Sequence, residues 1–169
     1  MEIYLLRHGI AAQPGMISVA HDSERPLAPE GIQDMEKEAL GLRRMGFAFD
    51  RIISSPYSRA HETAKIVSEA LEFKGNIELN DSLIPEASSR NFVKILKSLT
   101  DDERILFVGH MPSLAEFVSR LLCGSDDAAL NFKAGGFCCI DLPNPYKTHS
   151  RGELKYFLSP KQIQNYHPQ

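Results

Sequence analysis

The stretch IYLLRHGIA, residues 3–11, joins an apolar run directly to a polar corner. Its first four residues are all apolar, which is typical of a strand buried on both faces of a parallel sheet. Arg7, His8 and Gly9 follow at once, so the strand ends on a cation, an imidazole and a glycine. The stretch therefore predicts a buried strand that delivers two polar side chains to one place.

Outward from this stretch, strands alternate with helices through most of the chain. RIISS (51–55) and RILFVG (104–109) are further apolar strands, and each is followed by a run with helical spacing of apolar residues. This alternation predicts an α/β fold, namely a three-layer α/β/α sandwich with a mostly parallel central sheet. The expected strands are 2–7, 51–55, 76–79, 104–109, 136–142 and 153–159, and the expected helices begin near 29, 58, 90 and 112.

Two helix starts are marked in the sequence. Pro29 suits a first turn, although Ala28 stands before it where a Ser or Thr cap is usual. Ser58 is predicted to be the N-cap of the helix after the second strand. The expected buried face of the first helix holds Ile32, Met35, Ala39 and Leu42.

Composition limits the classes of function. The 169 residues are the size of one domain, so we expect a single domain over 1–169. The net charge of −3 gives no overall basic field, which argues against nucleic acid or an anionic membrane as a partner. No run of 18 apolar residues and no signal-peptide pattern occur, and we expect a cytoplasmic monomer.

The three cysteines do not suggest disulfides or a metal site. Cys138 and Cys139 are adjacent in an expected strand and should face opposite sides of the sheet. With Cys123 they make an odd number, and no His or Cys spacing resembles a zinc site. We therefore expect buried free thiols and no zinc site among the cysteines.

Polar residues follow three of the expected strands. Arg7 and His8 follow the first, Arg59 lies in the first turn of the helix after the second, and His110 follows the third. In such folds ligands bind beyond the carboxyl ends of the strands. Two guanidinium groups and two helix N-termini favour a phosphate-like anion, and Gly9 would let backbone approach it. The sequence therefore predicts a phosphate pocket.

A histidine in such a pocket has two possible roles. One imidazole can attack phosphorus if it presents an unprotonated nitrogen, and a hydrogen bond from its other N–H to a carbonyl would fix that tautomer. Neighbouring arginines would lower its pKa. The second histidine can donate to the phosphoryl oxygens in the transition state.

Three motifs at these strand ends resemble the histidine phosphatase superfamily, which includes phosphoglycerate mutases and many phosphatases. They are LLRHG (5–9), SSPYSRAHETA (54–64) and FVGHMP (107–112). Within the superfamily the chain is similar to the small SixA-type phosphohistidine phosphatases. That similarity rests on the short length, on SERPLAPEG (23–31) and on LKYFLSPKQI (154–163).

The resemblance implies a phosphoglycerate mutase-like fold and assigns site roles. His8 would be the phosphorylated nucleophile, and Arg7, Arg59 and His110 would complete the phosphate pocket without a metal or an organic cofactor. The partner would be a phosphohistidine-bearing protein of the phosphorelay or phosphocarrier type.

Three positions bear on how far the family pattern applies. Glu86 is the only carboxylate in the middle of LIPEASSRN (83–91), where larger relatives carry a general acid in different surroundings. Pro14 stands six positions after His8, where mutases and many phosphatases place a polar residue. His21 and Asp22 are candidates for the rim of the pocket. A weak acid favours phosphohistidine as substrate, because a protonated imidazole leaves as a neutral ring without a dedicated acid.

Three functions stay open at this stage. The first is hydrolysis of protein phosphohistidine through phospho-His8, with Glu86 dispensable. The second is a broad-specificity small-molecule phosphomonoesterase, which would need Glu86 as general acid. The third is a non-catalytic phosphoprotein-binding module, which intact His8 and His110 argue against.

Overall fold

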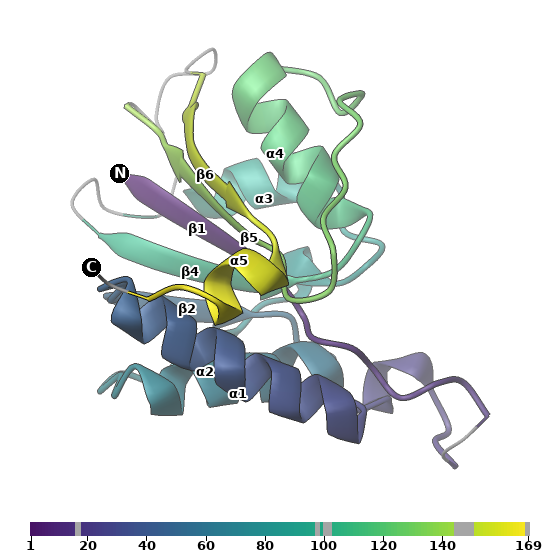
Figure 1. The fold of residues 1–169 in the computed structure, drawn as a ribbon. Coiled ribbons are helices and arrows are strands. Elements are labelled where there is room, and N and C mark those ends of the chain that lie inside the picture. The colour runs from purple at the N-terminus through teal and green to yellow at the C-terminus, as the bar shows by residue number, and fades with distance from the viewer. Residues whose placement is uncertain (16–17, 97–98, 100–102, 144–150, 168–169) are drawn as a thin grey trace.

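The computed structural model describes residues 1–15, 18–96, 99, 103–143 and 151–167. A six-stranded sheet, in the order β3-β2-β4-β1-β5-β6, forms the middle layer (Figure 1). The strands are β1 (Glu2–Arg7), β2 (Arg51–Ser54), β3 (Ile77–Leu79), β4 (Arg104–Gly109), β5 (Phe137–Asp141) and β6 (Glu153–Leu158). The helices are α1 (Pro29–Arg44), α2 (Ser58–Ala70), α3 (Ser89–Leu96), α4 (Ser113–Cys123) and α5 (Pro160–Gln164), with short 3₁₀ turns η1 (Asp22–Glu24) and η2 (Asp81–Leu83).

The sheet is parallel at its centre and antiparallel at one edge. β1 pairs with β4, β4 with β2, and β2 with β3, all in parallel. β5 and β6 add to the far side of β1 in antiparallel order. The predicted three-layer sandwich with a mostly parallel sheet is therefore confirmed.

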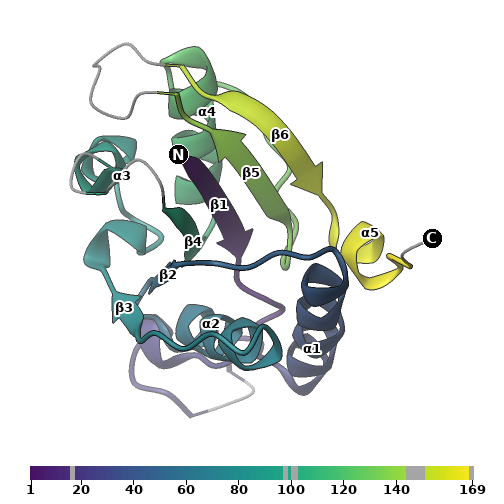
Figure 2. The same cartoon turned by 90° about the vertical axis from the view of Figure 1, so that its left-hand side faces the viewer.

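Alternate residues of the central strands supply two separate cores. In β1, Ile3 and Leu5 belong to the core under α3 and α4, whereas Tyr4 and Leu6 belong to the core under α1, α2 and α5. Figure 2 shows these two groups of helices on opposite faces of the sheet. Both faces of β1 are buried because helices cover both, which explains its continuous apolar run.

The cysteines follow the same alternation with one exception. Cys138 packs in the core under α3 and α4 and Cys139 in the other core, as predicted, and both are fully buried. Cys123 is exposed, so the expectation of a buried thiol is wrong there. Cys123 is the last residue of α4, immediately before the left-handed Gly124 that ends the helix, and lies beyond the stripe that packs on the sheet.

Two expected helix features are also wrong. Tyr57, not Ser58, is the N-cap of α2, and its N–H donates to Ser55 Oγ at 3.3 Å. Ile32 is 40% exposed instead of buried. The neighbouring Gly31 faces inward at that turn, where an added Cβ would lie 2.0 Å from the carbonyl oxygen of Ile10. The backbone at Ile10 therefore packs against α1 at Gly31, and the next residue, Ile32, faces outward.

The C-terminal helix α5 was not predicted. It follows β6 directly and begins with a capping box, in which the side chains and backbone of Ser159 and Gln162 are joined. α5 packs on α1 so closely that a Cβ on Gly41 would lie 2.2 Å from the carbonyl oxygen of Ile163. The expected helix over 90–99 is observed as α3 up to Leu96, and 97–98 lie outside the described residues.

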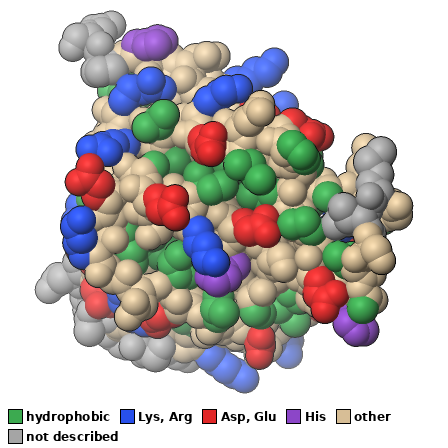
Figure 3. Space-filling model, turned by 90° about the horizontal axis from the view of Figure 1, so that it is seen from below, with side chains coloured by type: hydrophobic (Ala, Val, Ile, Leu, Met, Phe, Trp, Pro, Cys, Tyr) green, Lys and Arg blue, Asp and Glu red, His purple; other side chains and the backbone are tan. Residues whose placement is uncertain are grey.

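The distribution of side chains on the surface gives little indication of a function. The face seen in Figure 3 intersperses acidic, basic and hydrophobic side chains. In the described parts of the chain, no helix is both long and apolar enough to cross a bilayer.

Candidate active site

The central strands end level with one another and bring the two histidines together. Arg7 of β1 pairs with Gly109 of β4, and the backbone N–H of His8 donates to the Gly109 carbonyl at 3.0 Å. His8 and His110 therefore leave the sheet side by side, with ring centroids 4.9 Å apart. Both side chains are buried, with exposed fractions of 9% and 1%.

The ring of His8 is held in one orientation. Its Nδ1 lies 2.6 Å from the carbonyl oxygen of Gly9, which can only accept, so Nδ1 carries a proton. Burial lowers the pKa of His8 to about 4, against the opposing effect of the Gly9 hydrogen bond and with smaller contributions from the charges of Arg59 and Arg7. At neutral pH the ring is therefore uncharged, and Nε2 has a free lone pair.

A chain of hydrogen bonds connects this support to Arg59. The N–H of Gly9 donates to Thr63 Oγ1 at 3.1 Å, and the Thr63 hydroxyl donates to the carbonyl of Arg59 at 2.7 Å. The sequence analysis did not single out Thr63 as a site residue. Its position four residues after Arg59 was the available signal, because i and i+4 residues lie on one face of a helix.

Gly9 has a packing reason that the sequence did not show. An added Cβ would lie 2.5 Å from Met35 Cγ of α1. The glycine lets α1 approach the end of β1, whereas the sequence suggested that it lets backbone approach a ligand.

Ser55 is a site residue that sequence reasoning missed. His110 Nε2 lies 2.9 Å from Ser55 Oγ, which already accepts from the Tyr57 N–H. The Ser55 hydroxyl is therefore free to donate to Nε2, and in that arrangement Nδ1 of His110 carries the proton. Burial lowers the pKa of His110 to about 2, and the neighbouring His8 and Arg59 add to the shift. The signal was the second Ser of SSPYS, directly after β2.

Arg59 is buried and Arg7 is half-buried, and the guanidinium group of each already donates hydrogen bonds within the protein. Arg7 Nη1 donates to the Phe132 carbonyl at 2.6 Å. Arg59, 3% exposed, donates from Nη1 to the Asp22 carbonyl at 2.8 Å and from Nη2 to Asp22 Oδ2 at 2.9 Å. The Arg59 guanidinium also lies over the Tyr57 ring, 5.1 Å from its centroid.

Asp22 lies at the rim, as its position in the first loop suggested, and it links two cations. Its other oxygen, Oδ1, accepts from Arg25 Nε at 2.8 Å. Partial burial opposes ionisation of Asp22, but the hydrogen bonds and charges of Arg25 and Arg59 hold its pKa below the usual value. Arg25 contributes positive charge to the surroundings of His8 and was not singled out from the sequence. The neighbouring His21 is exposed.

Glu86 lies at the edge of the site and not inside it. It is exposed, and its Oε2 accepts from the Tyr57 hydroxyl at 3.4 Å. The Tyr57 ring in turn packs against His110, with centroids 5.2 Å apart. Pro14, where relatives place a polar residue, is exposed in the first loop.

Three buried nitrogen atoms of the site have no hydrogen-bond partner: Arg7 Nε, Arg59 Nε and His110 Nδ1. In the described chain only two other buried side-chain atoms share this condition, and both are oxygens. Buried donors are nearly always paired, so three in one place indicate a missing acceptor. Among the described residues, no group of three His, Cys, Asp or Glu is arranged to hold a metal ion.

Comparison with known proteins decides the family. A model of the histidine phosphatase superfamily (branch 1) matches residues 3–84, which include Arg7, His8 and Arg59. An uncharacterized protein of Picosynechococcus sp. is 32% identical over 164 residues, which cover 95% of this chain and 98% of that protein. The chain belongs to the histidine phosphatase superfamily.

Other members of the superfamily extend the comparison past the matched region. Phosphohistidine phosphatase SixA of Escherichia coli is 28% identical over 126 residues, covering 73% of this chain and 76% of that protein. The structure of a protein histidine phosphatase SixA complexed with tungstate superposes with a TM-score of 0.83, at 24% identity over 96% of this chain and 99% of that one. The phosphoglycerate mutase-like fold and the SixA resemblance are therefore confirmed, and the chain is a superfamily enzyme.

Proposed function

We propose that this enzyme hydrolyses phosphohistidine on a protein partner through a phosphoryl intermediate on His8. The observation that carries the proposal is the set of three unpartnered donors, Arg7 Nε, Arg59 Nε and His110 Nδ1. Two of the three are cationic, and the helix α2 begins one residue before Arg59, so a phosphoryl group is the fitting acceptor. The name of the Escherichia coli relative supports phosphohistidine as the substrate class.

In the first step His8 acts as the nucleophile. Its Nε2 lone pair forms a bond to phosphorus while the bond from phosphorus to the substrate imidazole breaks. The substrate ring keeps the proton on its other nitrogen and leaves neutral. His8 keeps its own proton on Nδ1, where it is hydrogen-bonded to the Gly9 carbonyl, so no proton transfer is needed. The exchange of one imidazole for another is close to thermoneutral.

In the second step water attacks phospho-His8. The P–N bond breaks, a P–O bond forms, and His8 returns to its neutral tautomer. Both water protons stay on the released dihydrogen phosphate, which then loses one to solvent. The Arg7 and Arg59 guanidinium groups and the His110 N–H stabilise the charge on the phosphoryl oxygens in both transition states.

A small-molecule phosphomonoesterase is the second candidate. The observation in its favour is Glu86, which reaches the rim through Tyr57 and could protonate an alkoxide. Against it, Glu86 is exposed and no further hydrogen bond to the described residues fixes its position. A pure binding module has no need of a neutral His8 with a fixed tautomer.

We further propose that 1–169 act as one domain and that the protein partner is of the phosphorelay or phosphocarrier type.

The test compares a phosphorylated histidine protein with a panel of phosphate esters. We expect kcat/KM for phosphohistidine to exceed that for every ester by at least about 10²-fold. Glu86→Gln should change phosphohistidine turnover by less than about threefold, as should the control Glu30→Gln on the exposed side of α1. Comparable ester turnover, together with a loss of about 10²–10⁴-fold in Glu86→Gln, would establish the phosphomonoesterase instead.

A further inference from the structure

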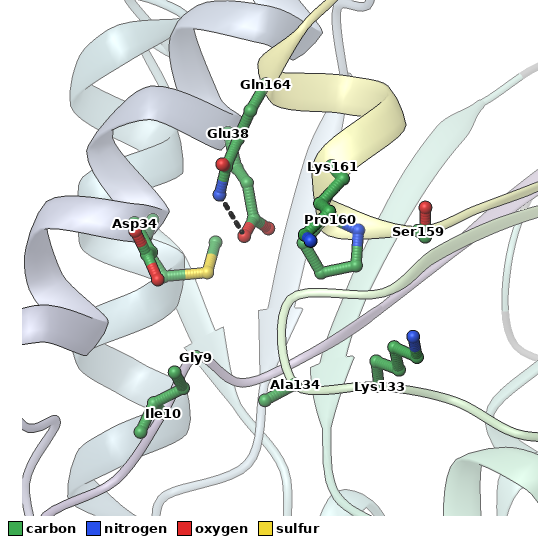
Figure 4. A pocket seen from close by; sticks show the side chains of 11 residues that line it. Gly9, Ile10, Asp34, Glu38, Lys133, Ala134, Ser159, Pro160, Lys161 and Gln164 are labelled. Carbon is green, nitrogen blue, oxygen red and sulfur yellow. Dashed lines mark hydrogen bonds between the residues drawn. The ribbon is translucent and has the colours of Figure 1, made fainter.

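A second pocket lies behind the candidate nucleophile. It has a volume of about 350 Å³ and is bounded by α1, α5, the residues after β1 and the loop before β5 (Figure 4). Gly9 and Ile10 line one side, directly after His8. No step of the proposed phosphoryl transfer uses this pocket.

A buried carboxyl group points into the pocket. Glu38 is 2% exposed, and Figure 4 shows its side chain extending from α1 between Gln164 and Ala134. Its Oε1 accepts from Gln164 Nε2 at 3.2 Å, whereas Oε2 has no partner. The other unpartnered buried oxygen of the described chain, Glu103 Oε2, lies 3.5 Å from Arg51 Nη1 and so has a cation beside it. Glu38 forms no ion pair with any described residue.

The backbone is shaped to admit this carboxyl group. Gly135 has a φ of +77°, and an added Cβ there would lie 2.3 Å from Glu38 Oε2. A side chain at 135 is therefore excluded both by the backbone conformation and by the carboxyl group. The site is built from two glycines, Gly9 and Gly135, around one acid.

The remaining charges of the pocket are divided between two sides. Asp34 lies one turn before Glu38 on α1 and pairs with Lys37 at 3.5 Å. Lys133, in the loop before β5, and Lys161, on α5, come from elements other than α1 and are exposed, and no ion pair joins either to a described residue. A ligand that satisfies both sides carries a cationic N–H donor at one end and an anion at the other.

We propose that this pocket binds a free amino acid, whose ammonium group donates to Glu38 Oε2 and whose carboxylate lies toward Lys133 and Lys161. The ammonium supplies the donor that the buried oxygen lacks. Burial raises the pKa of Glu38 to about 8, against the opposing effect of the Gln164 hydrogen bond and with a smaller contribution from the charge of Asp34. Binding of an ammonium group at pH 7 therefore releases a proton from Glu38.

The pocket and the nucleophile share their supports. The Gly9 carbonyl holds His8 Nδ1, and the N–H of Gly135 donates to the carbonyls of Arg7 and His8 at 3.1 and 3.2 Å. A bound amino acid would contact Gly9, which lines the pocket, and the Glu38 carboxyl group, against which Gly135 packs. The site is therefore placed to act on the orientation of His8 without touching the substrate.

The first test measures binding without any phosphatase assay, so its result is independent of the proposed function. The full chain is heated with each of the twenty free amino acids in turn. We expect at least one to raise the unfolding midpoint by about 2–4 °C when present at roughly tenfold its Kd. The N-acetyl derivative of that amino acid should give no shift, and its amide a smaller one. No shift with any of the twenty, or an equal shift with the N-acetyl derivative, would overturn the proposal.

The second test uses variants and titration calorimetry. Glu38→Gln should weaken binding at least tenfold, whereas Glu36→Gln, on the exposed side of the same helix, should leave Kd unchanged. If Glu38→Gln does not fold, the exposed pair Lys133→Gln and Lys161→Gln together should weaken binding severalfold. Calorimetry at pH 7 in buffers of different ionisation enthalpy should show proton release with the wild type. Unchanged binding in Glu38→Gln or in the lysine variant, or proton uptake, would contradict the assignment.

Discussion

The candidate active site around His8 and the pocket lined by Glu38 are both next to Gly9, and both contain buried polar atoms without a hydrogen-bond partner. On one side, three buried nitrogens of Arg7, Arg59 and His110 lack an acceptor. On the other, one buried oxygen of Glu38 lacks a hydrogen-bond partner. Since burying an unpaired polar atom is costly, each set indicates the charge of what binds there. The difference therefore supports both proposals, namely that an anion binds beside His8 and that a cationic group binds beside Glu38.

The same burial moves the pKa values in opposite directions. It lowers the pKa of His8 to about 4 and that of His110 to about 2, because a buried imidazolium is disfavoured. It raises the pKa of Glu38 to about 8, because a buried carboxylate is disfavoured. His8, His110 and Glu38 are therefore all uncharged at pH 7 in the protein without a ligand, and only Glu38 is proposed to change its protonation on binding.

The largest effect is expected from removing the nucleophile. His8→Asn should reduce phosphohistidine turnover by at least about 10⁴-fold, since no other group can form the covalent intermediate. The matched control is His61→Asn, a partly exposed histidine of α2, which should keep full activity. Turnover and circular dichroism of both variants check this. Phosphohistidine turnover by His8→Asn within tenfold of the wild-type rate would contradict the proposed role of His8 as nucleophile.

The next largest effect concerns Glu38 and the pH dependence of stability. The pKa of Glu38 is raised in the fold, so its contribution to stability is present below pH 4.5 and is lost as pH rises toward 8. Glu38→Gln should remove this loss, making the variant more stable relative to wild type at pH 8 than at pH 5 by about 2–5 kcal/mol. Urea unfolding at both pH values measures it. Parallel pH curves for the two proteins would contradict the account.

The histidines give the opposite slope on the acid side. The pKa values of His8 and His110 are depressed in the fold, so their contribution is present above pH 6.5 and is lost as pH falls toward 4. The fall between pH 6.5 and 4 should persist in Glu38→Gln, which separates the two pockets in one set of unfolding curves.

A smaller effect is expected at Ser55. Ser55→Ala removes the hydroxyl beside His110 Nε2, so the ring can place its proton on either nitrogen. We expect kcat to fall by about fivefold with little change in KM, since one hydrogen bond is worth about 1 kcal/mol. Ser54→Ala is the control, because its hydroxyl donates only to the Ser55 carbonyl. A rise in KM alone would show that Ser55 acts in binding.

The smallest effect is expected at Asp22. Its carboxylate occupies Arg59 Nη2 at 2.9 Å and places a negative charge beside the anion pocket. Asp22→Asn should therefore strengthen competitive inhibition by inorganic phosphate by about two- to fivefold, the range for an exposed ion pair. Weaker inhibition by phosphate would mean that Asp22 chiefly positions Arg59.

Most of the fold follows from the sequence because the central strands are covered on both faces. Apolar runs such as RILFVG mark them directly, and the helices are long enough for their spacing to be visible. The helix α5 has only five residues and follows a strand without a loop, so no periodicity could reveal it. Its one local signal was the S-x-x-Q pattern of Ser159 and Gln162.

The candidate site likewise contains residues that the sequence predicts and contacts that it does not. Arg7, His8, Arg59 and His110 lie in motifs at strand ends, and parallel pairing brings strand ends together. The contact between Asp22 and Arg59 spans 37 residues and depends on the path of a loop, which no local pattern determines. No pattern in the sequence distinguishes Glu38 from the other polar residues of α1, because it is buried by the packing of α5 and of the loop that contains Gly135.

The central claim is that phosphoryl transfer passes through His8. The most direct measurement is rapid quenching of the enzyme with a phosphohistidine protein labelled on phosphorus, followed by mass spectrometry of the peptide that contains His8. The account predicts a label on His8 that is stable in alkali, labile in acid and absent from His8→Asn. Turnover without any label on His8, or a label that persists in His8→Asn, would contradict it.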